Sequence, residues 1–123
     1  MNNRFLIGGL CFAYIILSGF WLNRTGRPLN VLILTTHKLT SVAAVVYLIV
    51  IVYRAHQLSA LSPTLIAACA VALVCFAIMI ATGGLLSTAK PMPPVILKTH
   101  QIMPYLVLLA STASLYLLPV RVQ

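Results

Sequence analysis

Long apolar runs separated by short polar segments dominate this sequence. Four runs, at about 5–22, 31–53, 64–86 and 95–118, contain very few charged residues. Each is close to or above the ~20 residues that a helix needs to cross ~30 Å of hydrocarbon. The pattern therefore predicts four transmembrane helices. Because the linkers are short, it also predicts an up-down-up-down bundle in a single domain, 1–123.

The linkers contain residues that end or begin helices. Gly26 and Pro28 follow the first run, and Pro63, Pro93 and Pro94 stand where the third and fourth runs begin. The first helical position tolerates proline, because its missing N–H has no intrahelical partner there. These residues favour short turns between the helices.

Composition supports a lipid environment. The chain has 123 residues, of which 62% are hydrophobic, 7% are charged and none is Asp or Glu. Soluble domains carry about a quarter charged residues, so the sequence predicts an all-α membrane protein. The formal charge of +8 comes without a basic patch interleaved with aromatic residues, so we expect anionic lipid headgroups or an anionic cofactor as partners, and no nucleic acid.

The missing carboxylates exclude several classes of function. Proton relays and cation transporters generally use acids within the membrane, and catalysis by a pair of carboxylates is impossible here. Cys11, Cys69 and Cys75 lie within apolar runs, where a thiol acts as a small hydrophobic group. No Cys-x-x-Cys-His motif occurs, which excludes covalent attachment of a c-type haem.

An internal repeat is the strongest indication of function. The segment Arg27-Pro28-x4-Ile33-Leu34-x-Thr36-His37 recurs without a gap as Lys90-Pro91-x4-Ile96-Leu97-x-Thr99-His100. Each copy opens an apolar run, so the sequence predicts a repeat of two helices. His37 and His100 should then enter the membrane from the same side at matching depth, roughly 8–9 Å along their helices at 1.5 Å per residue.

The expected bundle would let these two histidines share one ligand. In a sequential four-helix bundle the second and fourth helices are diagonal neighbours, with axes on the order of 11–14 Å apart. Two imidazoles that reach inward to one iron, with Fe–N bonds of roughly 2 Å, fill such a gap. The sequence thus favours a planar macrocycle held between His37 and His100.

Small and basic residues lie on the same side of the predicted membrane. Gly19 and Gly83, preceded by Ser18 and Thr82, end the first and third runs, where they let a helix or a flat ring approach closely. Five cations flank the motif, and we expect them to bind the propionates of a haem. They are Arg24, Arg27, Lys38, Lys90 and Lys98.

Four further residues near the histidines differ in their expected roles. Thr36 and Thr99 are candidates to orient the imidazole rings. Pro104 cannot donate to the His100 carbonyl and could bend its helix, whereas Ser41 occupies the matching place after His37.

A structural interpretation stays open. A histidine within the membrane often only hydrogen-bonds a neighbouring helix, and a duplicated gene repeats a structural histidine too. Against this, the apolar runs offer no other strongly polar partner. If the pair does bind a metal, haem b is favoured over copper or zinc, because two histidines complete its axial shell whereas structural zinc usually takes four ligands. His56 is expected to be a solvated histidine at the opposite rim.

With His37, His100, Gly19 and Gly83 in place, the chain resembles membrane b-type cytochromes of the four-helix kind. These proteins hold a bis-histidine haem between helices and exchange electrons with quinones or partner subunits. The resemblance implies one non-covalent haem b on His37 and His100, and one-electron transfer rather than oxygen activation. It implies a redox carrier or subunit rather than a complete enzyme, located in the bacterial inner membrane, with homo-oligomers left open.

Two other classes compete with the cytochrome. One is a cofactor-free membrane subunit or assembly factor whose histidines cross-link helices. The other is a small transporter or channel, for which the lack of acids leaves only anion passage along the basic rim.

Overall fold

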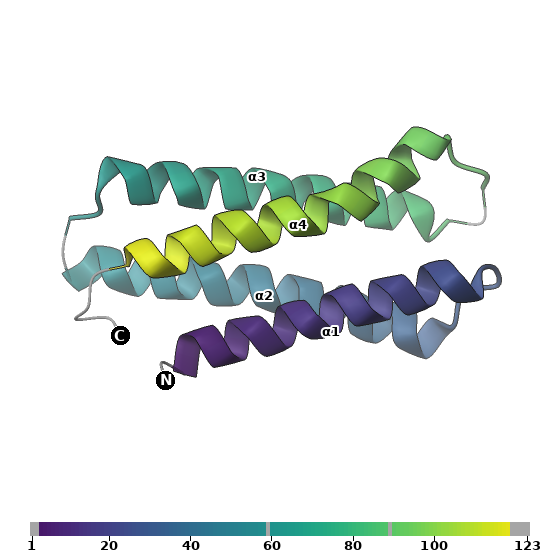
Figure 1. Cartoon of the computed structure of the whole chain (residues 1–123), viewed down its shortest axis with the longest axis horizontal. Helices are drawn as coiled ribbons and strands as arrows, with labels where there is room; N and C mark the ends of the chain where they lie inside the picture. Colours follow the sequence, from purple (N-terminus) through teal and green to yellow (C-terminus); the bar gives the residue numbers. More distant parts are fainter. Residues whose placement is uncertain (1–2, 59, 89, 119–123) are drawn as a thin grey trace. The chain divides into compact units, whose positions relative to one another are not determined.

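Four α-helices and no strands make up the part of the chain that the computed structural model describes, residues 3–58, 60–88 and 90–118. The helices are α1 (Asn3–Thr25), α2 (Val31–Leu58), α3 (Pro63–Leu86) and α4 (Pro94–Leu117) (Figure 1). The predicted all-α fold class is confirmed.

Local capping explains where three of the helices begin. Asn30 Oδ1 accepts a hydrogen bond from the Ile33 amide at 3.1 Å at the start of α2. Ser62 Oγ accepts from the Leu65 amide at 3.2 Å, and Pro63 takes the first position of α3. Pro94 likewise opens α4. Each residue either satisfies an exposed amide or removes it.

Helix ends were harder to predict than helix starts. The prediction ended the second helix at 53, but α2 continues to Leu58, because Arg54 to Gln57 end the apolar run without breaking the helix. For the same reason α1 extends beyond 22 to Thr25. The chain then turns at Gly26, whose φ of +67° favours glycine.

The chain divides into two compact units, Met1–Tyr47 and Leu48–Gln123. The first unit contains α1 and the first part of α2, and the second contains the rest of α2 with α3 and α4. The prediction of one domain stays a prediction, and each unit is described by itself below.

Within the second unit, α3 and α4 pack against each other. The buried positions of α3 include Leu65, Cys69, Ala72 and Phe76, a spacing of three and four residues that marks one helical face. On α4, Ser111 and Ser114 are among the buried residues. Small residues on facing helices allow close approach of the backbones, as in other membrane helices.

Three of the four helices, with candidate spans Phe5–Thr25, Val31–Leu58 and Pro63–Leu86, are long and apolar enough to cross a membrane. Large apolar side chains point outward along all four helices; Leu17 and Leu109, for example, are 68% and 71% exposed. An outer surface of this kind suits lipid, and soluble monomers rarely show one. α4 is not among these spans; its first turns carry Lys98, His100 and Gln101.

Candidate functional site: two histidine clusters

The first histidine cluster consists of Ser18 and Gly19 on α1 and His37 on α2. His37 Nδ1 lies 2.8 Å from Ser18 Oγ, and both side chains are buried. Ser18 Oγ also donates to the carbonyl of Tyr14, four residues earlier, at 2.6 Å. The cluster therefore joins α1 to α2 through a buried polar contact.

The second histidine cluster consists of Thr82 and Gly83 on α3 and His100 on α4. His100 Nδ1 lies 2.9 Å from Thr82 Oγ1, which donates to the carbonyl of Ile78, four residues earlier, at 2.7 Å. The His100 ring also hydrogen-bonds the backbone of Met79, whose carbonyl lies 3.1 Å from Thr82 Oγ1. The second hairpin thus repeats the arrangement of the first.

Each glycine makes room for the histidine ring of its own cluster. A Cβ atom added at Gly19 would lie 3.2 Å from Cε1 of His37, and one added at Gly83 would lie 2.9 Å from Cε1 of His100. Gly84 and Gly9 have nothing within 4 Å of such an atom. The glycines predicted to admit a helix or a flat ring therefore lie against the edge of an imidazole.

The hydroxyl partners of the histidines were not predicted from the sequence. Ser18 and Thr82 were expected only as small residues. The expectation that the apolar runs offer no other strongly polar partner was wrong, because both hydroxyls contact an imidazole. A signal was available, because a hydroxyl residue directly precedes each of these glycines. Thr36, proposed to orient His37, hydrogen-bonds the Tyr14 hydroxyl and donates to the Leu32 carbonyl.

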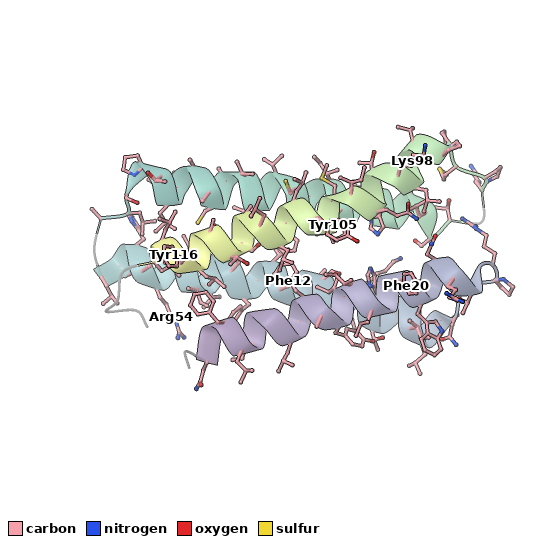
Figure 2. The ribbon with its side chains drawn as sticks, viewed as in Figure 1. Phe12, Phe20, Arg54, Lys98, Tyr105 and Tyr116 are labelled. Atoms are coloured by element: carbon pink, nitrogen blue, oxygen red, sulfur yellow. The ribbon has the colours of Figure 1, made fainter. Side chains whose placement is uncertain are left out.

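The five predicted cations are exposed and are divided between the two units. Arg24, Arg27 and Lys38 belong to the first unit, at the end of α1, in the linker and beside His37. Lys90 and Lys98 belong to the second unit, and Figure 2 shows Lys98 in the first turns of α4. Each cluster therefore has cations on its own hairpin, at the end where the two helices are joined.

His56 belongs to a different environment. It is exposed on α2 and, with Tyr53, borders an apolar groove against α3 that Cys69 and Leu73 also line. Its exposure agrees with the prediction of a solvated histidine. His56 is thus a useful control for His37 and His100.

No protein-family model, curated protein or solved structure matches the chain. Function is therefore inferred from the two histidine clusters. Among the described residues, no three His, Cys, Asp or Glu side chains lie together as a metal-binding group. Each cluster offers one imidazole, a donor that suits a cofactor needing single axial ligands.

Proposed function

We propose that the protein is an integral membrane b-type cytochrome in which His37 and His100 are the axial ligands of one haem b. The observation that carries the proposal is the recurrence of one arrangement, a hydroxyl, a glycine and a histidine, in both hairpins. In each case Nδ1 is hydrogen-bonded within the hairpin, which is the usual environment of a histidine that ligates through Nε2.

Each cluster supplies groups that such a cofactor would use. Haem b supplies reversible one-electron chemistry at its iron, and two axial imidazoles leave no position open for oxygen. Ser18 and Thr82 would hold the rings, while Gly19 and Gly83 set how closely each ring approaches the neighbouring helix. Arg24, Arg27, Lys38, Lys90 and Lys98 are exposed and would bind the propionates through charge-assisted hydrogen bonds.

The proposal extends to the surroundings of this cytochrome. In this proposal α4 also spans the membrane, and the protein lies in a bacterial inner membrane. Its redox partner is a quinone, which dissolves in the same lipid, or another redox subunit. The protein carries electrons and is not a complete enzyme.

Visible absorption of the full chain, purified in detergent from haem-replete cells, tests this function. We expect a Soret band that sharpens on reduction and one haem per chain. His37→Ala and His100→Ala should each abolish the bis-histidine spectrum, whereas His56→Ala should leave it unchanged. A colourless wild-type protein, or an unchanged spectrum in both ligand variants, would contradict the proposal.

One observation favours a second candidate, a cofactor-free membrane subunit. The same contacts that orient His37 and His100 also join α1 to α2 and α3 to α4, so the histidines already have structural partners. In that case the protein is colourless, and His37→Ala and His100→Ala lower only its stability. The spectrum distinguishes the two candidates.

A further inference from the structure

The hydroxyl groups of Ser18 and Thr82 each have one proton and two kinds of neighbour. Ser18 Oγ lies 2.6 Å from the Tyr14 carbonyl and 3.2 Å from that of Ile15, and Thr82 Oγ1 lies 2.7 Å and 3.1 Å from those of Ile78 and Met79. Carbonyl oxygens only accept hydrogen bonds, so these contacts form only when the hydroxyl proton is directed to them. Serine and threonine within helices commonly donate in this way to the carbonyl four residues earlier.

This use of the hydroxyl proton determines what the oxygen can offer the imidazole. With its proton on a carbonyl, the oxygen has only lone pairs to direct at Nδ1, which lies 2.8 Å away in the first cluster and 2.9 Å away in the second. Nδ1 must then be the donor. A hydroxyl that donates to a carbonyl is also a better acceptor, because the two hydrogen bonds polarise each other.

We propose that Ser18 and Thr82 are positioning residues that hold His37 and His100 in the tautomer protonated at Nδ1, so that Nε2 of each ring has the lone pair that binds iron. The final clause rests on the proposed function, whereas the tautomer does not. The hydrogen bond at one ring nitrogen decides which nitrogen is available to a metal. The same bond increases the donor strength of the ligand, and losing such a partner typically costs about 10–100-fold in metal affinity.

The tautomer is measurable without haem. Protein labelled with nitrogen-15 at histidine and prepared as the full chain without haem in detergent has three histidines, and His56→Gln leaves only those of interest. Nitrogen-15 NMR should show protonation at Nδ1 and a lone pair at Nε2 for both rings. Protonation at Nε2 would overturn the proposal, and this readout leaves every residue of the two histidine clusters unchanged.

Matched variants separate the hydroxyl from the space that it fills. Thr82→Val keeps the branched shape and removes the hydroxyl acceptor. The preference of the His100 ring for protonation at Nδ1 should weaken, with the Met79 backbone left as the other partner of the ring, while His37 keeps its own. Thr82→Ser should restore the wild-type spectrum of His100. Ser18→Ala and Ser18→Thr form the corresponding pair for His37. Tautomers that do not change in Thr82→Val and Ser18→Ala would show that the hydroxyls do not set them.

Haem titration links the tautomer to ligation. Thr82→Val should weaken haem binding about 10–100-fold and Thr82→Ser should recover it. A wild-type chain protonated at Nδ1 that binds no haem would leave the tautomer proposal standing and remove the proposed function. A chain that binds haem equally well in wild type, Thr82→Val and Ser18→Ala would remove the role of the hydroxyls in ligation and leave the cytochrome standing.

Discussion

The two histidine clusters have the same central contacts but are supported differently. In the first, the Ser41 hydroxyl donates to the His37 carbonyl at 2.8 Å, and the Tyr14 hydroxyl bonds that of Thr36, the residue before His37. In the second, Pro104 stands at the place of Ser41 and Ile78 at the place of Tyr14, and neither side chain can hydrogen-bond.

The contact between histidine and glycine, by contrast, is closer in the second cluster. His37 is 9% exposed, and a Cβ atom at Gly19 would lie 3.2 Å from its ring. His100 is partly exposed, and a Cβ atom at Gly83 would lie still closer to its ring, at 2.9 Å. The first cluster thus has more hydrogen bonds around its histidine, and the second has the closer contact between histidine and glycine. The repeated motif has the same central geometry in both hairpins, although the surrounding residues differ.

The largest expected difference between the clusters comes from adding one methyl group. Gly83→Ala places Cβ 2.9 Å from the His100 ring, so the ring must move and its contact with Thr82 is disturbed. We expect a loss of about 1–3 kcal/mol in unfolding free energy, as for other overpacked sites. Gly19→Ala, at 3.2 Å, should cost less. Unfolding by SDS in mixed micelles measures both.

Gly84→Ala is the matched control, because nothing lies within 4 Å of its added Cβ. It should be neutral or stabilising by up to about 1 kcal/mol, since alanine favours helix over glycine. If Gly83→Ala were as stable as Gly84→Ala, the close contact with His100 would not be a constraint.

A smaller effect is expected at Pro104, where the second copy of the repeat differs from the first. Pro104 cannot donate to the His100 carbonyl, so Pro104→Ala restores a backbone donor inside α4. We expect a gain of about 1 kcal/mol, the usual net contribution of one hydrogen bond. Thermal unfolding in detergent provides the measurement, with Leu109→Ala, at a 71% exposed position on the same helix, as a control. A destabilised Pro104→Ala would indicate that the ring of the proline packs usefully.

The sequence predicted the fold better than the site because the two depend on different information. Apolar length and linker prolines located all four helices, and the starts at Pro63 and Pro94 were predicted within one residue. The end of α2 was missed because the apolar run stops before the helix does. Hydropathy therefore located the helices well and their polar ends poorly.

His37 and His100 were identified as candidates because an internal repeat can be recognised from the sequence alone. Their hydroxyl partners were not identified. A hydrogen bond between helices depends on how each helix is rotated about its axis, whereas the spacing of residues in the sequence gives only their position along the helix. Ser18 and Thr82 face the rings, which residue type alone could not establish. The expected meeting of His37 and His100 stays a prediction, and the spectrum of the purified protein is its test.

A further comparison uses the hydroxyl bridge that only the first cluster has. Tyr14→Phe removes the bond to Thr36 but keeps the ring. Hydrogen bonds between membrane helices contribute about 0.6 kcal/mol on average, so we expect a loss of that size in SDS unfolding. Tyr105→Phe, on α4 and 66% exposed, is the control. Equal stability of the two variants would mean that the bridge does not support His37.

The smallest effect should come from Ser41→Ala. The Ser41 hydroxyl donates to the His37 carbonyl, but that carbonyl can also accept the backbone amide four residues later in α2. Because the acceptor keeps a partner, the loss should stay below about 0.5 kcal/mol, at the low end for a hydrogen bond. The His37 tautomer, read by nitrogen-15 NMR, should not change. A change in that tautomer would mean that the backbone of α2, and not only Ser18, sets the protonation of the ring, and the first cluster would then be constrained differently from the second.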